Sequence, residues 1–165
     1  MARHRHVPGT LTFGWTPLRK VFAEPNFHDL ILEHWHELGL HKDVAPLDPD
    51  FARCLACEDA GIFKAWTAYD GQTLVGYCAW FIQPHLHYRS TIYAVEDLFL
   101  LSAPYRRGMT GLRLFTTCFP ELKKLGVVKC LLHTKVHFER ERGGLTKFLV
   151  RLGFENTDNL WMKIL

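Results

Sequence analysis

Hydrophobic residues in the first third of the chain recur at helical spacing. In the segment 24–40 they fall at steps of three and four residues, which predicts an amphipathic helix with Asn26 as its cap. The pair Asp48-Pro49 predicts a second helix over 48–59, because aspartate caps helices and proline fits their first turn. The first twenty residues contain several turn formers and are expected to hold at most one short strand.

The pattern changes to strand spacing in the middle of the chain. Two apolar segments, 62–69 and 74–82, flank the dipeptide Asp70-Gly71, which is typical of a tight hairpin turn. A third strand is expected over 92–101, and it carries two adjacent acidic residues. These three strands are predicted to be antiparallel.

Helices and strands are predicted to alternate in the last third. A helix is expected over 112–125, and the strand 127–134 after it is apolar at nearly every position, which predicts burial on both faces. The remaining elements are a final helix, beginning at Glu141 or Leu145 and ending at Leu152, and two short strands, near 154 and over 160–165.

Together these elements predict an α+β (mixed α/β) fold in a single domain, 1–165. The central sheet is expected to be mixed and mostly antiparallel, with about four helices around it. The strands 92–101 and 127–134 are joined through a helix, so they are expected to be parallel neighbours with a right-handed crossover.

Composition supports a compact domain. The 165 residues are 48% hydrophobic and 22% charged, no apolar stretch approaches the ~20 residues that span a bilayer, and the first residues lack the apolar core of a secretory signal. The five cysteines lie mostly in apolar segments, which favours buried thiols in the reducing cytoplasm. Cys54-Leu-Ala-Cys57 is a single CxxC pair, and we interpret it as helix packing rather than a zinc or redox site.

The most informative segment is the turn that follows the third strand. Two adjacent arginines, Arg106 and Arg107, precede Gly108, while Thr110 and Gly111 lie just before the next helix. A helix start offers unpaired backbone N–H groups and partial positive charge, which suit a phosphate. The arginines add cationic donors, the glycines leave room for close approach, and Thr110 can cap the helix. The turn therefore predicts phosphate binding, although similar turns also occur for structural reasons alone.

Two motifs carry a resemblance to a known family. Arg106-Arg107-Gly108-Met109-Thr110-Gly111 resembles the Gln/Arg-x-x-Gly-x-Gly/Ala motif of the GNAT superfamily of acyl-CoA N-acyltransferases, with the middle glycine one position early. Phe148-Leu-Val-Arg-Leu-Gly-Phe154 is similar to the Phe-Tyr-x-x-Leu-Gly-Phe ending of that family's last helix. The segment Tyr-Arg-Arg-Gly-Met-Thr-Gly-Leu-Arg-Leu resembles a phage-associated branch of this superfamily. The resemblance covers roughly 63–165, and the first sixty residues match only as a helical pair.

The resemblance implies where acetyl-CoA would bind. The strands 92–101 and 127–134 would splay apart, and the pantetheine arm would lie between them like an added strand. The residues expected to contact acetyl-CoA are Phe99, Leu100 and Leu101 through backbone groups along the pantetheine, and Arg106, Arg107, Gly108, Met109, Thr110, Gly111 and Leu112 around the pyrophosphate.

Acetyl transfer to an amine needs a group that takes the proton of the amine. The mid-strand acids Glu96 and Asp97 are the candidates. Strand alternation places Asp97 on the same face as Phe99 and Leu101, and in family members with a glutamate base on this strand the base shares that parity, so Asp97 is favoured. Either carboxylate can instead form an ordinary ion pair across the sheet.

The family often uses a tyrosine of the last helix as the general acid for the leaving thiolate, and this chain has Leu149 at that position. His133 and His137, near the end of the strand 127–134, are the candidate substitutes. The histidines of the first helix do not stack on one face, so no metal site is expected.

The sequence therefore predicts a cytoplasmic N-acetyltransferase that uses acetyl-CoA as co-substrate and acts on an unidentified small-molecule or peptide amine, without a metal or a membrane partner. The alternative is a non-catalytic CoA-binding or protein-interaction module on the same fold, which the missing tyrosine favours. Nucleic-acid binding is not expected, because no stacking aromatic residues alternate with the N-terminal arginines. A homodimer stays an open alternative.

Overall fold

The computed structural model describes residues 9–106, 108–135 and 144–164, which belong to two compact units, Met1–Leu132 and His133–Leu165. The elements of the first unit are β1 (Leu11–Thr16), α1 (Leu18–Phe22), α2 (Phe27–Leu38), α3 (Phe51–Asp59), β2 (Phe63–Asp70), β3 (Thr73–His85), β4 (Tyr88–Leu101), a 3₁₀ turn (Ala103–Tyr105), α4 (Thr110–Lys124) and β5 (Val127–Leu131). The second unit contains α6 (Leu145–Arg151).

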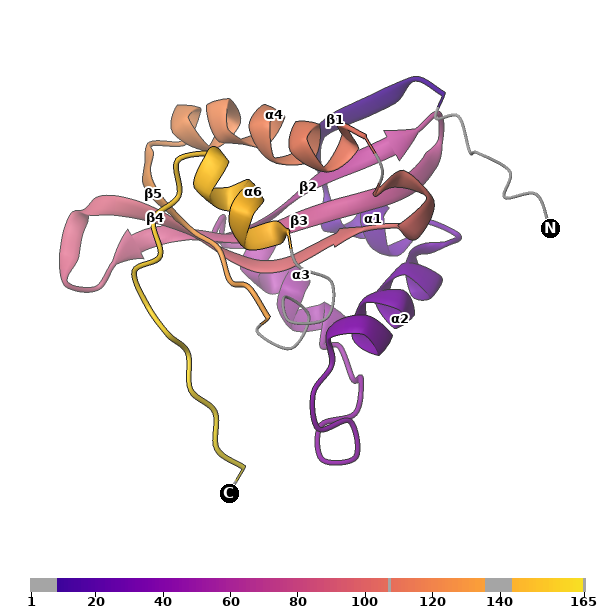
Figure 1. The fold of residues 1–165 in the computed structure, drawn as a ribbon, viewed down its shortest axis with the longest axis horizontal. Coiled ribbons are helices and arrows are strands. Elements are labelled where there is room, and N and C mark those ends of the chain that lie inside the picture. Colours follow the sequence, from indigo (N-terminus) through magenta and orange to yellow (C-terminus); the bar gives the residue numbers. More distant parts are fainter. Residues whose placement is uncertain (1–8, 107, 136–143, 165) are drawn as a thin grey trace. The chain divides into compact units, whose positions relative to one another are not determined.

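The five strands form one mixed sheet in the order β1-β2-β3-β4-β5, as Figure 1 shows. Each neighbouring pair is antiparallel except β4 and β5, which run parallel and are joined through α4. The predicted α+β fold with a mostly antiparallel sheet and one parallel pair is therefore confirmed. The hairpin at Asp70-Gly71 is confirmed as well, and Gly71 supplies the left-handed backbone that the turn needs, with a φ of 59°.

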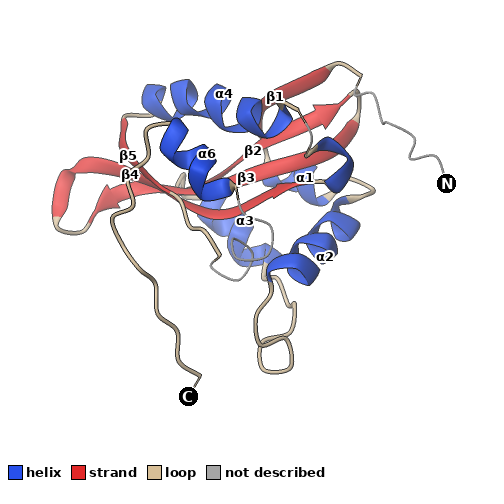
Figure 2. Cartoon of the chain, in the orientation of Figure 1, coloured by secondary structure: helices blue, strands red, loops and turns tan. Residues whose placement is uncertain are grey.

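Helices cover both faces of the sheet (Figure 2). The helices α1, α2 and α3 pack on one face, where the core includes Leu18, Leu30 and Tyr77. The helix α4 packs on the other face and buries Leu114 and Phe115. Among the helices that the structure describes, none combines the length and the apolar character that a bilayer crossing requires.

One predicted cap residue has a different side-chain role, and one helix starts later than predicted. Asn26 is the N-cap of α2, but its side-chain amide donates to the carbonyl of Leu74 at 2.7 Å instead of capping the helix. The helix α3 begins at Phe51 rather than at Pro49, because the carboxylate of Asp50 accepts the backbone N–H of Arg53 at 2.9 Å and so acts as the N-cap. The short helix α1 was not predicted, since it is too brief to show a periodic pattern.

The last predicted strands are partly wrong. The strand β5 ends at Leu131, and Val128 is 69% exposed, so β5 is not buried on both faces; it is the edge strand of the described sheet. The described residues 154–164 contain no strand, and Leu160 and Trp161 are 85% and 90% exposed. The alternation of apolar residues in this segment is therefore not matched by strand pairing among the described residues. The helix α6 agrees with the later of its two predicted starts.

Candidate functional site

The pairing between β4 and β5 ends halfway along β4. Their pairing runs from Ile92–Val127 to Val95–Leu131, where β5 ends, while β4 continues to Leu101. In the described part of the chain no strand pairs with this second edge of Leu98–Leu101. An exposed strand edge can accept an extended, amide-containing ligand as an added strand. The described pairing thus agrees with the splayed strand pair that the resemblance implies.

A β-bulge separates the two acidic residues of β4. Trp80 of β3 lies opposite Glu96 and Ala79 lies opposite Leu98, so Asp97 is the extra residue. Because of this bulge, Glu96 shares a face of the sheet with Phe99 and Leu101, and the parity predicted for Asp97 is wrong. A plain count of alternating residues fails here since the bulge adds one residue to β4 alone.

The two acids consequently lie in different surroundings. The side chain of Glu96 is only 7% exposed and lies on the face that α4 covers; its charge raises the pKa of the buried Cys78 thiol, after burial itself. Asp97 is exposed, and its charge raises the pKa of Cys54 on α3, second to the effect of burial. Of the two acids, Asp97 is therefore the one that solvent reaches.

The helix start after β4 presents backbone donors. Within the described residues, no acceptor is found for the backbone N–H groups of Gly108–Leu112. The first donor of α4 with a partner there is the N–H of Arg113, which binds the carbonyl of Met109 at 2.9 Å. Met109, not Thr110, is the N-cap, and no side chain caps the helix, so the predicted capping role of Thr110 is wrong. An anion at this helix start would meet these backbone donors and the positive end of the helix dipole.

The two glycines of this turn leave open space. Gly108 has a φ of 83°, in the left-handed region that favours glycine, and a Cβ added there would meet no atom within 4 Å. A Cβ added at Gly111 would lie 3.7 Å from Cδ2 of Leu101, which is an ordinary contact. The packing of the described residues therefore does not itself require glycine at position 111.

The side chain of Arg106 is already engaged by the protein. Its Nε donates to the carbonyl of Leu101 at 2.5 Å, and its two terminal nitrogens donate to Glu33 at 2.6 Å and to Glu37 at 2.7 Å. The sequence predicted this guanidinium as a phosphate donor, whereas the structure places it on two carboxylates of α2. We call Arg106, Glu33 and Glu37 the Arg106 cluster.

A second contact fixes the same turn. The hydroxyl of Tyr105 donates to the carboxylate of Asp70 at 2.9 Å. Burial, this hydrogen bond and the charge of Asp70 raise the pKa of Tyr105 to about 12. The turn after β4 is thus tied both to α2 and to the end of β2.

For four other predicted positions, the described residues give no distance or contact at this site. Arg107 and His137 lie outside the described residues. His133 and Leu149 belong to the second unit; His133 is exposed and Leu149 is buried in α6. Within the described residues, no group of three His, Cys, Asp or Glu side chains is arranged to hold a metal ion.

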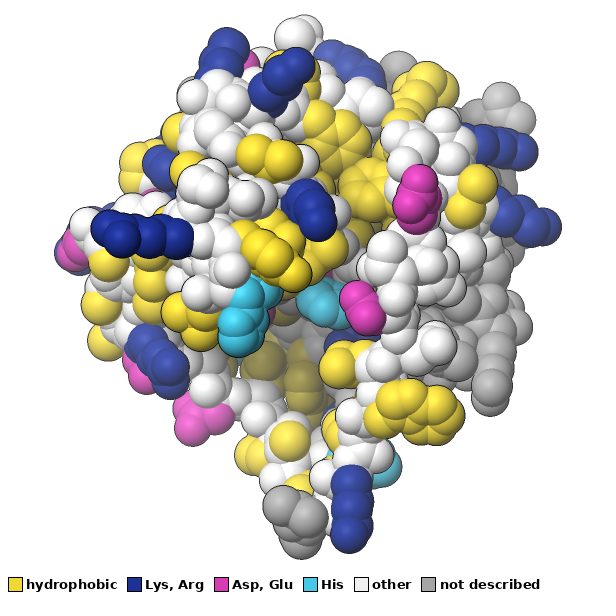
Figure 3. All heavy atoms as spheres, turned by 90° about the vertical axis from the view of Figure 1, so that its left-hand side faces the viewer, with side chains coloured by type: hydrophobic (Ala, Val, Ile, Leu, Met, Phe, Trp, Pro, Cys, Tyr) yellow, Lys and Arg dark blue, Asp and Glu magenta, His cyan; other side chains and the backbone are white. Residues whose placement is uncertain are grey.

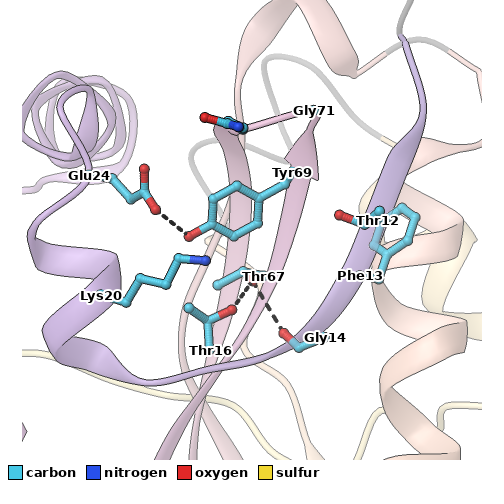
Figure 4. Close-up of a pocket in the computed structure, with 10 residues that line it drawn as sticks. Thr12, Phe13, Gly14, Thr16, Lys20, Glu24, Thr67, Tyr69 and Gly71 are labelled. Atoms are coloured by element: carbon cyan, nitrogen blue, oxygen red, sulfur yellow. Dashed lines mark hydrogen bonds between the residues drawn. The ribbon is translucent and has the colours of Figure 1, made fainter.

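A polar pocket of about 430 Å³ lies elsewhere, between β1, β2 and α1 (Figure 4). On its wall the hydroxyl of Tyr69 donates to Glu24 at 2.8 Å, and the ammonium of Lys20 lies 5.1 Å from the centre of the Tyr69 ring. The hydroxyls of Thr16 and Thr67 lie 2.7 Å apart. The sequence-predicted site residues are not among those that line this pocket.

The hairpin between β3 and β4 ends in exposed side chains. Leu86 is 97% exposed and Tyr88 is 57% exposed, and the rings of His85 and Tyr88 lie 5.0 Å apart. Figure 3 is drawn from the side on which this hairpin ends in Figure 1, and histidine and hydrophobic side chains reach the surface on that face.

Sequence reasoning missed three features of the site. The Arg106 cluster joins residues 69 and 73 positions apart, and the Tyr105–Asp70 bond spans 35 positions, so no local motif predicts either. The bulge at Asp97 has no signature in the alternation of β4. A pair of acids inside an apolar strand was the one available signal that this segment is irregular.

Comparisons with known proteins bear on the fold. No family model matches the sequence, and no curated protein matches it. Among solved structures, an aminoglycoside acetyltransferase from an uncultured soil metagenomic sample has a TM-score of 0.68 at 12% identity, with 93% of this chain and 96% of that chain covered. Ribosomal-protein-alanine N-acetyltransferase from Brucella melitensis biovar Abortus 2308 has a TM-score of 0.68 at 13% identity, with 94% and 99% covered. AAC(6')-Iy in complex with the bisubstrate analog CoA-S-monomethyl-acetylneamine has a TM-score of 0.62 at 15% identity, with 94% and 98% covered. The chain therefore has the fold of the GNAT acetyltransferases.

Proposed function

We propose that this protein is an N-acetyltransferase of the GNAT superfamily that transfers an acetyl group from acetyl-CoA to an amine. The observation that carries the proposal is the combination of an unpaired strand edge at Leu98–Leu101 with a helix start whose N–H groups at Gly108–Leu112 have no acceptor among the described residues. These two features adjoin along the chain, and they suit an extended amide chain that ends in a diphosphate.

The residues present fit acetyl-CoA at this place. Backbone groups of Phe99, Leu100 and Leu101 would pair with the amides of the pantetheine arm. The N–H groups from Gly108 to Leu112, with Met109, Thr110 and Gly111 between them, would hold the pyrophosphate, and Arg107 would add positive charge. Arg106 contributes through the Arg106 cluster, because its donors already bind Leu101, Glu33 and Glu37.

Asp97 is the proposed general base. In the reaction the amine nitrogen forms a bond to the acetyl carbon, the carbon–sulfur bond breaks, and the proton of the amine passes to a carboxylate. Asp97 is exposed at a bulge where β5 no longer covers the edge of β4, whereas Glu96 is almost completely buried on the α4 face. Exposure thus supports Asp97, although the parity argument for it fails, and Glu96 is the alternative base.

The leaving thiolate needs a proton donor or solvent, and Leu149 cannot donate. His133 and His137 are the proposed substitutes for the missing tyrosine. The alternative function, a non-catalytic CoA-binding or protein-interaction module, is favoured by this same observation at Leu149.

The five cysteines are all free thiols, which supports a reducing compartment such as the cytoplasm.

Titration calorimetry with acetyl-CoA and with CoA tests the proposal. We expect binding of both in the micromolar range, because strand-like pairing and a diphosphate site act together. Absence of heat at high micromolar ligand, at two temperatures, would contradict acetyl-CoA binding. Release of free thiol with a panel of small amines and peptide N-termini then separates the two functions: a catalyst releases thiol only when an amine is present, and a binding module does not.

A further inference from the structure

We propose that Glu33 and Glu37 of α2 are positioning residues, which act through Arg106 to hold the turn after β4 in the shape that receives a diphosphate. This inference rests on the proposed function, because it concerns how the same site is kept in place. It assigns a role in cofactor binding to a helix that contributes no residue to the predicted cofactor contacts.

The bonds of the Arg106 cluster all converge on the end of β4 and the turn after it. Arg106 itself belongs to the turn, and its Nε holds the carbonyl of Leu101, the last residue of β4. Glu33 accepts twice with the same oxygen, from Arg106 at 2.6 Å and from the backbone N–H of Ala103 at 3.1 Å. The helix α2 thus holds two points of the turn, and Arg106 in turn holds the end of the strand.

The helix α2 is itself held on the sheet, so the cluster has a firm base. His34, between the two glutamates, is buried, and its Nδ1 lies 3.3 Å from the hydroxyl of Tyr77 on β3. Asn26, at the start of the helix, binds the carbonyl of Leu74. Burial, and after it the charge of Glu33, raise the pKa of Tyr77.

Charge and burial make this cluster different from a surface ion pair. The side chains of Arg106, Glu33 and Glu37 are 27%, 28% and 21% exposed, so water screens them only in part. One guanidinium faces two carboxylates, and the cluster carries a net charge of −1. Three of the five N–H groups of this guanidinium bind protein acceptors, so it is better suited to fixing the backbone beside a diphosphate than to binding the diphosphate itself.

The opposite role predicts an opposite result, which makes the test sharp. If Arg106 were a direct phosphate ligand, removing Glu33 would release it and remove a repulsive charge, so CoA affinity would rise. If Glu33 positions the turn, the same change leaves Arg106 and the Ala103 N–H without their shared acceptor, so CoA affinity falls.

The experiment uses Glu33→Ala and Glu37→Ala in the full chain, with Glu121→Ala as the matched control. Glu121 forms an ion pair of 2.7 Å with Lys124, at the far end of α4 from the turn. Calorimetry measures binding of CoA and of pantetheine, which lacks the diphosphate. We expect Glu33→Ala to weaken CoA about tenfold, Glu37→Ala to weaken it less, and pantetheine binding to stay unchanged in both. Unchanged or tighter CoA binding by Glu33→Ala would overturn the inference.

A second measurement needs no ligand and covers the case of poor folding or of a wild-type chain that does not bind CoA. Amide exchange of Tyr105 and Arg113, whose N–H groups bind the carbonyls of Ser102 and Met109, is compared between wild type, Glu33→Ala and Glu121→Ala, together with the NMR shifts of Gly108 and Gly111. Faster exchange in Glu33→Ala alone supports the positioning role even if CoA does not bind, in which case only the proposed function fails. Identical exchange in all three proteins would overturn the positioning role, whether or not the protein binds CoA.

Discussion

The two halves of β4 have different neighbours in the sheet. From Ile92 to Val95 the strand has β3 on one side and β5 on the other, and Ala94 there is completely buried. From Glu96 onward, β3 is its only partner strand among the described residues, and this half contains a bulge and carries both acids. The first half secures the parallel pair, and the second half gives up sheet hydrogen bonds at an edge that a ligand can use. Two halves that differ in this way show how a paired part of the sheet and a proposed binding edge can share one strand.

The largest effect is expected at the bulge. Asp97→Asn keeps the size of the side chain but cannot take a proton, so we expect kcat to fall about 1,000-fold with little change in the KM for acetyl-CoA. Glu96→Gln is the matched variant on the same strand and should reduce kcat much less. Thiol release with the amine identified from the panel measures both. A larger loss in Glu96→Gln would transfer the role of base to the buried acid.

The next largest effect is expected at the start of α4, which follows the second half of β4 along the chain. Gly111→Trp places an indole where the diphosphate is proposed to bind, and we expect the Kd for CoA to rise at least about 100-fold. Gly111→Ala is the control, because its Cβ makes only an ordinary 3.7 Å contact with Leu101 and should change the Kd less than about threefold. Calorimetry measures both, and tight binding by Gly111→Trp would place the ligand elsewhere.

The two halves of β4 should differ in how far a charged substitution lowers the free energy of unfolding. Ala94→Asp puts a charge at a fully buried position between two strands, and we expect the free energy of unfolding to fall by about 3 kcal/mol. Leu98→Asp, at a position that is 40% exposed, should cost about 1 kcal/mol or less. Urea unfolding followed by circular dichroism gives both values. Equal losses would mean that the two halves are buried alike in solution.

The smallest effect comes from Tyr105, which ties the turn after the second half to Asp70. The pKa of Tyr105 is raised from 10.0 to about 12, so between these values the unfolded chain loses its proton more readily than the folded one. The stabilisation is complete below pH 10 and is lost as the pH rises through about 12. Unfolding free energies of wild type should therefore fall more steeply between pH 9 and pH 11.5 than those of Tyr105→Phe. Parallel pH profiles would mean that the Tyr105 hydroxyl titrates normally.

Much of the fold could be predicted because its signals are local. The spacing around Leu30 predicts α2, Asp70-Gly71 predicts the hairpin, and the helix between β4 and β5 requires a parallel pair. The proposed site stays a prediction, but it too rests on a local signal, since a glycine turn before a helix places backbone amides at a helix start. The parity of Asp97 could not be predicted, because a bulge is set by the pairing with β3. The partners of Arg106 could not be predicted either, because any of the 17 acidic residues could have paired with it.

The bonds that shape the turn after β4 also have a kinetic consequence. They join residues 35, 69 and 73 positions apart, so none can form before distant parts of the chain have met. We therefore expect the turn to acquire its native shape late in refolding, after the hairpins of the sheet. A graft of residues 96–112 into another scaffold would carry the motif but leave behind α2 and the end of β2, and with them the restraints that give the motif its form.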